Sequence, residues 1–285
     1  MSFPIRHRLE YWSARVLAAL VRLLPLRLGW ALGAILGQLA FSIVRVRRRV
    51  TMENLHHAFS ESRSHRELTK IGARCYRNLG RGLVEFCRFP SLTRRNLSRI
   101  LEIEGLEHCT RGLAQGKGVI ILSGHFGAWE LLSPAFGLLV SRHRRQVGIA
   151  IHRIGHTPWG VVRSLRRNRL VIILADQDGG RDGIFIPFLG RLASTARGAA
   201  RFAMETGATV LMSFVVRQPG NRHRLIIHPA MEIPRSCNRE EDLFEILKTY
   251  TQCLETYVRI YPEQWFWPHR RWKSRPPADD PAAPT

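Results

Sequence analysis

Residues 118–130 read GVIILSGHFGAWE, and this stretch decides which fold we expect. Its first part is a continuous apolar run at 119–122, which is typical of a short strand buried on both faces of a parallel sheet. The run breaks at Ser123 and Gly124, a turn sequence, and the residues from Phe126 onward favour a helix start. His125 is therefore predicted at the carboxyl end of a strand, where ligands and catalytic groups gather in open α/β sheets.

Similar apolar runs recur along the chain and alternate with helical patterns. The other runs lie at 147–151, 170–174, 210–216 and 225–227. Helical patterns lie at 131–140, 158–167, 195–206 and 240–260. This alternation predicts an α/β fold with a mostly parallel central sheet flanked by helices. Apolar residues between 51 and 95 also recur at helical spacing, and Pro90 ends that helical region.

The segment at 28–44 carries no charge, and its length is at the lower limit for a helix that spans a bilayer. Gly29, Gly33 and Gly37 fall on one helix face, as small residues do where helices meet closely in lipid. Arginines flank both ends, which suits a helix that dips into or lies in an anionic leaflet. A buried helix of a soluble core is the alternative. We expect a membrane anchor at 1–50, the main domain at 51–275 and a disordered tail at 276–285.

The chain is strongly basic, with 44 basic and 22 acidic residues and a formal net charge of +22. Either an anionic partner or arginine-rich codon usage accounts for this excess. The basic residues are spread along the chain without an RNP, zinc-finger or helix-turn-helix signature, which argues against nucleic acid. The five cysteines are odd in number and include no CxxC pair, so neither a disulfide framework nor a zinc ribbon is expected. A reducing compartment fits best.

His125 and Glu130 are the first candidates for chemistry, because a buried imidazole and a buried carboxylate are costly unless paired or used. If His125 precedes the helix, Glu130 can hold one ring nitrogen and leave the other as a general base. A capping histidine beside a surface glutamate is the alternative. No third metal ligand lies near in sequence, and no complete dinucleotide fingerprint is present. We therefore expect no metal and no cofactor.

Four blocks occur in order along the chain: RVRRRVTMENLHHAFSE, GKGVIILSGHFGAWE, ILADQDGGRDGIFIPFLGRLASTARGAARFAMETGA and YPEQWFWPHRRWK. Over residues 45–273 the sequence resembles the bacterial lipid A biosynthesis acyltransferases, late lauroyl and myristoyl transferases of the lysophospholipid acyltransferase superfamily. The resemblance implies a glycerolipid acyltransferase-like fold at 51–275. It also implies acyl transfer from acyl carrier protein to a hydroxyl of a lipid A precursor. That acceptor is a phosphorylated glycolipid. The resemblance further implies that the protein works at an anionic membrane surface, on the cytoplasmic face of the bacterial inner membrane.

The resemblance also implies roles for individual residues. His125 matches the catalytic histidine of the family, Glu130 its acidic partner, and Asp176 in the block ADQD a carboxylate that the family needs. A His–Glu pair without a positioned Ser or Cys nucleophile suits direct attack by an activated hydroxyl in a ternary complex, with no covalent acyl-enzyme. Glycine-rich backbone or an arginine could stabilise the oxyanion. The alternative for Asp176 and Asp178 is that they are simply turn residues at the end of a strand.

Two departures from the family pattern affect these expectations. Ala128 stands where the family commonly has asparagine. The segment between Arg153 and Asp176 is shorter than in the family, whose catalytic-region arginine normally lies within it. Arg153 matches the family arginine that opens this segment and is expected to bind substrate. Arg163, Arg166 and Arg167 are candidates to replace that arginine. The shortening also keeps open a catalytically weak homologue or an inactive scaffold.

Further substrate-binding residues are expected from Asp176 to the C-terminal block. These are Gln177, Thr195, Gly198, Arg270 and Arg271. Thr195 and Gly198 fit a helix start, either as a phosphate-binding N-terminus or as a structural cap. The tryptophans and arginines at 265–272 fit either an interfacial belt with phosphate contacts or C-terminal packing. The acceptor itself is not specified by the sequence, so a glycerophospholipid or a glycosylated phosphoinositide is the alternative.

Overall fold

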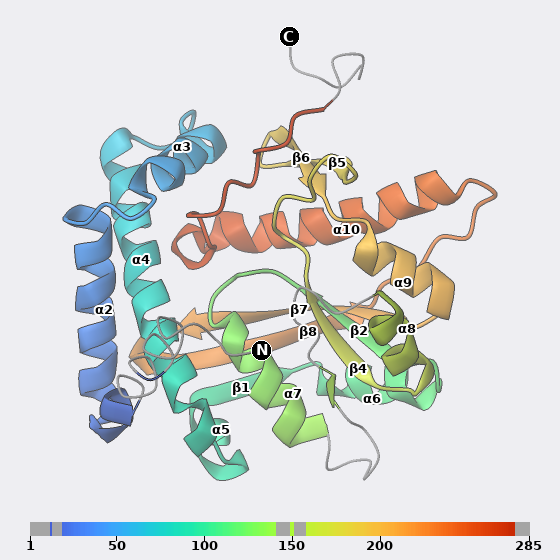
Figure 1. The fold of residues 1–285 in the computed structure, drawn as a ribbon, viewed down its shortest axis with the longest axis horizontal. Helices are drawn as coiled ribbons and strands as arrows, with labels where there is room; N and C mark the ends of the chain where they lie inside the picture. Colours follow the sequence, from blue (N-terminus) through green and yellow to red (C-terminus); the bar gives the residue numbers. More distant parts are fainter. Residues whose placement is uncertain (1–11, 13–18, 141–148, 151–157, 277–285) are drawn as a thin grey trace.

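The computed structural model describes residues 12, 19–140, 149–150 and 158–276. A six-stranded sheet lies at its centre, in the order β1-β8-β7-β2-β4-β3 (Figure 1). Its strands are β1 (Leu101–Glu104), β2 (Val119–Ser123), β3 (Ile149–Ala150), β4 (Leu170–Leu174), β7 (Thr209–Gln218) and β8 (Arg222–Ala230). Neighbouring strands are parallel except β7 and β8, which form an antiparallel pair. The predicted α/β fold with a mostly parallel sheet is confirmed.

β2 lies between β4 and β7, and all five of its residues are buried. Because side chains alternate across a strand, Ile120 and Leu122 join one core cluster while Val119 and Ile121 join another. Helices cover both faces of the sheet: α8 (Pro158–Arg166), α9 (Gly198–Thr206) and α10 (Arg239–Ile260) on one, and α5 (Arg94–Ile100), α6 (Leu106–Ala114) and α7 (Leu132–Val140) on the other. This burial on both faces explains why the strand is a continuous apolar run.

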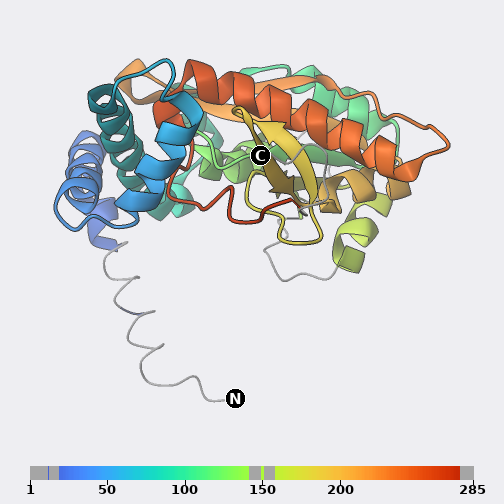
Figure 2. The same ribbon diagram turned by 90° about the horizontal axis from the view of Figure 1, so that it is seen from above.

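Three N-terminal helices pack at one end of the sheet, α2 (Leu26–Ser42), α3 (Arg48–Phe59) and α4 (His65–Arg88) (Figure 2). α2 lies along α4, and the predicted glycine stripe forms the contact. A Cβ added at Gly33 would lie 2.5 Å from the carbonyl oxygen of Gly80, so only glycine permits this approach. The stripe therefore makes a helix contact inside the protein. The predicted domain boundary at residue 50 lies within α3.

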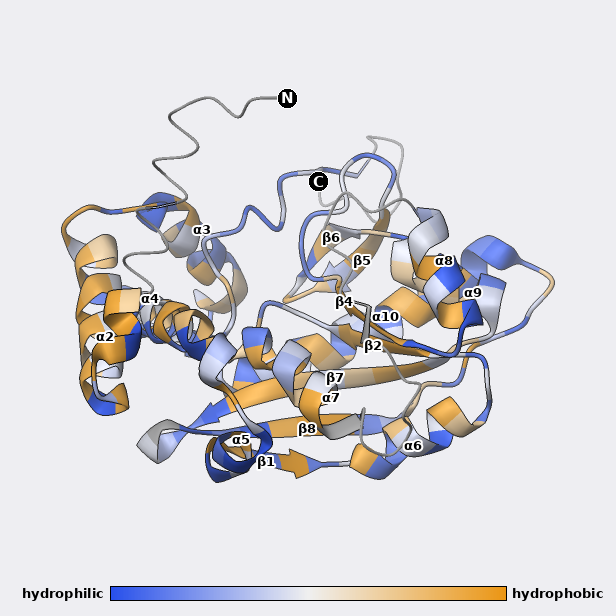
Figure 3. Ribbon diagram, turned by 60° about the horizontal axis from the view of Figure 1, so that its bottom comes forward, coloured by the Kyte–Doolittle hydropathy of each residue, from blue (hydrophilic) through white to orange (hydrophobic). Residues whose placement is uncertain are grey.

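The other side of α2 is apolar and exposed, and α2 is coloured mostly as hydrophobic in Figure 3. We call this surface the apolar α2 face, and its residues are Leu28, Leu32, Ile35, Leu36, Leu39 and Ile43. Among the residues that the structure describes, no helix has both the length and the apolar character needed to cross a bilayer. The predicted tail lies almost entirely outside the described residues.

A small antiparallel hairpin, β5 (Ile184–Phe188) and β6 (Arg191–Thr195), follows β4 and was not predicted. Leu189 and Gly190 form its turn, both with positive φ. The helix predicted at 195–206 begins only at Gly198, because Thr195 is the last residue of β6. β1 was also missed, since its four residues, LEIE, mix apolar and acidic side chains.

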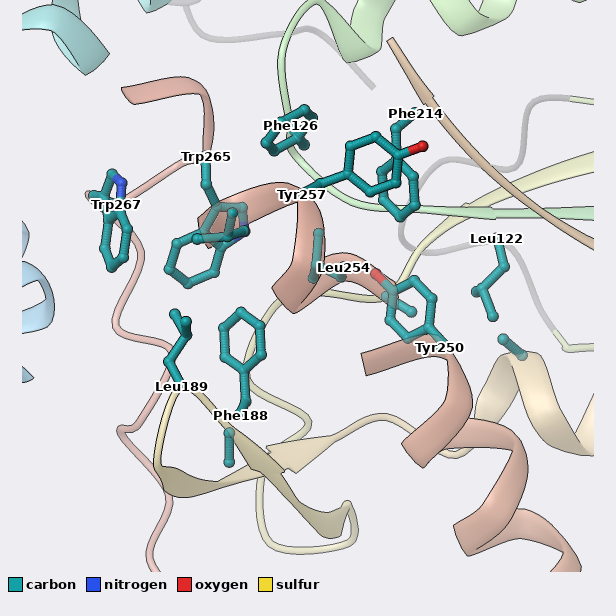
Figure 4. Close-up of a cluster of buried hydrophobic side chains, with 14 of the residues drawn as sticks. Leu122, Phe126, Phe188, Leu189, Phe214, Tyr250, Leu254, Tyr257, Trp265 and Trp267 are labelled. Atoms are coloured by element: carbon teal, nitrogen blue, oxygen red, sulfur yellow. The ribbon is translucent and has the colours of Figure 1, made fainter. Parts of the chain in front are cut away.

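An aromatic cluster fills the space between β2, the hairpin and the C-terminal segment (Figure 4). Trp265 and Trp267 are both fully buried in it, with ring centroids 4.7 Å apart. Phe188 of the hairpin packs edge-on against Trp265 at 5.3 Å. Of the two interpretations of this aromatic segment, packing is therefore the correct one for Trp265 and Trp267. The cluster forms a rigid base for the residues that follow β2 and β4.

Candidate active site

The turn after β2 is held tightly against its neighbours, which fixes the position of His125. Gly127 has a φ of +62°, and any side chain there would overlap the carbonyl oxygen of Val215 in β7. The backbone N–H of Gly127 donates to Gln264 O at 2.8 Å, and that of Phe266 donates to His125 O at 3.0 Å. β7 and the C-terminal segment thus hold the histidine on two sides.

His125 and Asp176 form a hydrogen-bonded pair at the carboxyl ends of β2 and β4. Nδ1 of His125 lies 2.7 Å from Oδ1 of Asp176, and the His125 backbone N–H donates to Oδ2 at 2.9 Å. The strand register explains the meeting: Ser123 pairs with Leu174, and the two functional residues each follow their paired position by two. Parallel neighbours end at the same edge, so this contact follows directly from the sheet.

The pair is arranged to leave one ring nitrogen available. An ionised carboxylate only accepts hydrogen bonds, so Nδ1 carries the proton and Nε2 of the neutral ring has a free lone pair. The His125 side chain is 19% exposed, whereas that of Asp176 is 2% exposed. The histidine side chain is therefore more open to a substrate than the carboxylate that orients it. The side-chain amide nitrogen of Gln177 lies 3.5 Å from Nε2 of His125.

The electrostatics of the pair suit a general base. Burial alone raises the pKa of Asp176, but hydrogen bonds from His125 and from Nε1 of Trp265, at 2.9 Å, hold that pKa below its usual value. For His125, burial lowers the pKa, but the hydrogen bond and charge of Asp176 outweigh it and raise the pKa above its usual 6.5. Sequence reasoning missed the role of Trp265, although it lies in one of the recognised blocks.

Glu130 does not hold a ring nitrogen of His125, contrary to the prediction from the sequence, because Asp176 makes that hydrogen bond. Glu130 lies in a 3-10 turn, Trp129–Leu131, and its carboxylate is beside Gly82 of α4. A Cβ on Gly82 would lie 3.7 Å from Glu130 Oε2 and 4.0 Å from Nη2 of Arg217. Burial raises the pKa of Glu130 to about 7, and nearby Glu85 adds to the rise. A catalytic role for Glu130 stays a prediction.

Aromatic rings border the exposed side of the histidine. Trp129 and Phe266 lie 5.5 and 5.9 Å from His125, measured between ring centroids. The three backbone amides that follow His125 are already engaged with carbonyl oxygens: Phe126 with Gly124, Gly127 with Gln264, and Ala128 with Val215. These amides are therefore not free donors for an oxyanion, contrary to one expectation from the glycine-rich turn.

A second buried carboxylate, Glu85 of α4, lies next to the candidate site. Arg217 donates to both of its oxygens, at 2.6 and 2.9 Å, and Nε1 of Trp30 donates at 2.8 Å. His223 Nε2 lies 3.3 Å from Glu85 Oε1. Arg217 and Glu85 are almost fully buried, and His223 is completely buried. The sequence gives no local signal for this cluster, since its members come from four separate elements.

Several predicted substrate-binding residues are structural in this fold. Arg271 is 1% exposed and binds the hairpin through Ser194 O and through Thr195 Oγ1, at 2.7 Å. Its Nη1 also donates to Gln177 O at 3.4 Å. Arg271 and Thr195 therefore brace the hairpin under the site and are not available to a phosphate. Gly198 only begins α9 behind Arg197, whereas Arg270 is exposed.

The arginines that the sequence offered as replacements for the expected family arginine do not gather at the site. Arg166 ends α8, and Arg167 lies in the short connection that leads into β4. Because a crossover helix runs antiparallel to its strands, these two lie at the opposite edge of the sheet from His125. Arg163 is exposed one turn earlier, and Arg153 lies outside the described residues. Within the described ranges, no three His, Cys, Asp or Glu side chains gather into a possible metal site.

The sequence matches a family model described as bacterial lipid A biosynthesis acyltransferase, in two pieces over residues 2–153 and 133–274. These pieces cover nearly the full chain. The chain belongs to this family. The two pieces overlap at residues 133–153.

Relatives of this chain are named as acyltransferases. The chain is 28% identical to the lipid A biosynthesis lauroyltransferase of Escherichia coli (strain K12), over 95% of this chain and 93% of that protein. It is 27% identical to the palmitoleoyltransferase of the same organism, over 86% and 85%. It is 25% identical to the phosphatidylinositol mannoside acyltransferase of Mycobacterium tuberculosis, over 68% and 67%. Like these relatives, this family member is an acyltransferase.

Proposed function

We propose that this acyltransferase moves a fatty acyl chain from acyl carrier protein to a hydroxyl of a lipid A precursor at the cytoplasmic face of the bacterial inner membrane. The observation that carries the proposal is the His125–Asp176 pair, in which Nδ1 and Oδ1 lie 2.7 Å apart on a histidine side chain that is 19% exposed. Coverage of nearly the full length of a lipid A lauroyltransferase supports the choice of acceptor.

In this mechanism His125 acts as a general base and no acyl-enzyme forms. The acceptor hydroxyl gives its proton to Nε2 of His125 as its oxygen attacks the thioester carbonyl carbon. Asp176 stabilises the imidazolium that results. The tetrahedral oxyanion then collapses, the C–S bond breaks, and the departing thiolate takes the proton back from Nε2. Binding both substrates at once supplies the orientation that a covalent intermediate would otherwise provide.

The apolar α2 face supports attachment to a membrane surface. Ile35 and Leu36 are 57% and 54% exposed on a helix whose opposite side packs on α4. Burial of such side chains at the headgroup boundary is favourable, and arginines near the helix attract anionic lipid. Replacing both residues by Asp in the full-length chain should reduce its sedimentation with phosphatidylglycerol vesicles.

Ile260→Asp is the matched control for this membrane test, because Ile260 is 60% exposed at the end of α10, far along the chain from α2. The control should sediment like the wild type. Equal sedimentation of the double Asp variant and the control would contradict membrane attachment through the apolar α2 face.

The catalytic proposal is tested with purified full-length protein, an acylated acyl carrier protein and a tetra-acylated or penta-acylated lipid A precursor. Mass spectrometry should show one added acyl chain and release of free carrier thiol. A mannosylated phosphoinositide is the comparison acceptor, because one relative carries that activity in its name. Transfer to the phosphoinositide alone would replace the proposed acceptor, and no transfer to either would overturn the proposal.

A further inference from the structure

A cavity lined by arginines lies beside the candidate active site and has no part in the mechanism above. Its volume is about 310 Å³, and its charged and polar lining includes Arg74, Arg77, Arg81, Arg217, Glu263 and Gln264. We call it the arginine pocket. The three α4 arginines are spaced by three and four residues, which places them on one face of the helix. Cavities of this size accept small molecules or headgroups.

The charges of the arginine pocket are unbalanced. Arg217 is neutralised by Glu85, which it contacts through both terminal nitrogens. In the described part of the chain, no ion pair engages Arg74, Arg77 or Arg81, and Glu263 is the one acidic side chain of the lining. Three guanidinium groups therefore face one carboxylate, an excess that an anion would neutralise.

Arg81 is the group best placed to bind such an anion. It is half-buried, and its Nε is buried with no hydrogen-bond partner. Burial, and then the charges of Arg217 and Arg77, lower the pKa of Arg81 by more than the charge of Glu85 raises it, so the free pocket holds cations that repel each other. A buried donor without a partner is costly, and a guanidinium fork matches the oxygens of a phosphate.

The arginine pocket and His125 lie toward the same edge of the sheet. Gln218, at the carboxyl end of β7, lines the pocket, and β7 runs parallel to β2. Gln264 forms the shared wall: its carbonyl accepts from Gly127, two residues after His125. Phe266, two residues further along the chain, donates to His125 O. Two residues of extended chain span roughly 7 Å, so the pocket is within reach of a substrate bound at the histidine.

We propose that the arginine pocket binds a phosphate group of the lipid acceptor and thereby holds the acceptor hydroxyl at His125. This inference rests on the proposed acyl transfer to a phosphorylated lipid. Free phosphate shares the same chemistry, so the two sources are separated in the experiment. An acidic protein surface is less well matched, because a convex surface would reach the exposed Arg74 and Arg77 but not the buried Nε of Arg81.

The first arm of the test measures inorganic phosphate binding to the full-length protein in detergent, by ³¹P line broadening at constant ionic strength. Arg81→Gln and Arg77→Gln should each weaken binding by about tenfold or more, because each removes a charged hydrogen bond. Arg81→Lys keeps the charge without the fork and should lie between. Arg66→Gln is the matched control, since Arg66 is exposed on the same helix outside the pocket. Thermal unfolding verifies that each variant is folded.

The second arm measures acyl transfer to a phosphorylated lipid A precursor and to the same lipid after phosphatase treatment. The wild type should show a KM about tenfold lower for the phosphorylated acceptor, and Arg81→Gln should abolish this difference while kcat changes little. Equal KM values for both acceptors in the wild type would overturn the proposal while leaving acyl transfer intact. A KM rise for acyl carrier protein alone in Arg81→Gln would overturn it in favour of a protein-docking surface.

The two arms separate this inference from the proposed function. Phosphate binding that depends on Arg81, with no acyl transfer to any acceptor, would support the arginine pocket and overturn the proposed function. Phosphate binding that is unchanged in folded Arg77→Gln and Arg81→Gln would overturn the pocket, whatever the transfer assay gives.

Discussion

Two buried carboxylates in this protein, Asp176 and Glu85, have similar partners but different surroundings. Each accepts a hydrogen bond from a tryptophan indole, Trp265 for Asp176 and Trp30 for Glu85. Each also has a histidine nearby. The Glu85 cluster adds the bidentate Arg217, which neutralises its charge, whereas the Asp176 site has His125 as its hydrogen-bonded titratable partner.

Solvent access distinguishes the two sites functionally. The side chain of His125 is 19% exposed, whereas that of His223 beside Glu85 is completely buried. A histidine that is oriented on one nitrogen and open on the other can exchange a proton with a substrate. A histidine enclosed with an already neutralised ion pair can only contribute to packing and charge balance. Perturbed carboxylates alone therefore do not single out a candidate catalytic site, and the solvent access of the partner histidine favours the Asp176 site.

The largest expected effect is the loss of activity in His125→Ala. Removing a general base typically costs about 10²–10⁴-fold in turnover. His223→Ala should instead lower the free energy of unfolding and leave turnover per folded molecule near wild type, because His223 is buried away from substrate. Acyl-transfer assays and urea unfolding on both variants provide the comparison. Similar activity losses in the two variants would remove the functional distinction between the sites.

Asp176→Asn should also impair turnover strongly and should shift its pH dependence. Asp176 raises the pKa of His125 above 6.5, and the base must be unprotonated, so wild-type turnover should rise with pH through this raised pKa. Without the carboxylate the pKa falls, so the rising limb should move to lower pH while the maximum decreases. The double variant with His125→Ala should be little worse than His125→Ala alone, because the pair acts as one unit. A pH limb that does not move would argue against this pairing.

Glu85→Gln should affect stability more than catalysis. It leaves Arg217 buried without a counter-charge, and breaking a buried ion pair costs about 3–5 kcal/mol of unfolding free energy. Replacing both partners by apolar residues, as in Glu85→Leu with Arg217→Met, should be less harmful than the single change. Denaturant midpoints at pH 7 measure both. A stable Glu85→Gln protein with poor turnover would place the cluster in the catalytic machinery.

Glu130→Gln should have the smallest effect at neutral pH. The pKa of Glu130 is raised from 4.5 to about 7, so the folded state binds the extra proton and wild-type stability should fall as pH rises between these values. Gln mimics the protonated form, so the variant should lose this decrease and keep more activity than Asp176→Asn. Unfolding midpoints from pH 5 to 8 test the first point. Activity as low as that of Asp176→Asn would restore Glu130 to the catalytic role predicted from the sequence.

The pKa of Glu85 is shifted in the opposite direction to that of Glu130. Burial raises the pKa of Glu85, but its partners, chiefly Arg217, lower it to about 2. Its contribution to stability is complete above the usual 4.5 and should be lost as pH falls toward 2. As pH rises, the contribution of Glu130 to the free energy of unfolding therefore decreases, whereas that of Glu85 increases. Acid unfolding of the wild type and of Glu85→Gln, compared at pH 3 and pH 6, distinguishes them.

Much of the fold could be predicted because its signals are local. The run at 119–122 is apolar at every position since the strand is buried on both faces, and Ser123 and Gly124 mark where it ends. This alone places His125 at the functional edge of a parallel sheet. β1 and the hairpin were missed because their stability comes from pairing and from Arg271, which lies far along the chain.

The sequence by itself determined the strand-turn-histidine unit, the alternation of strands and helices, and the family, because each depends on residues close together in the chain or on ordered blocks. Only the tertiary structure decided that Asp176, and not the nearer Glu130, holds His125. Residues fifty-one positions apart meet at 2.7 Å because β2 and β4 are parallel neighbours in register, whereas Glu130 turns toward α4 and Arg217. Spacing along the chain fixes contacts within one helix or turn, but contacts between strand ends depend on which strands pair.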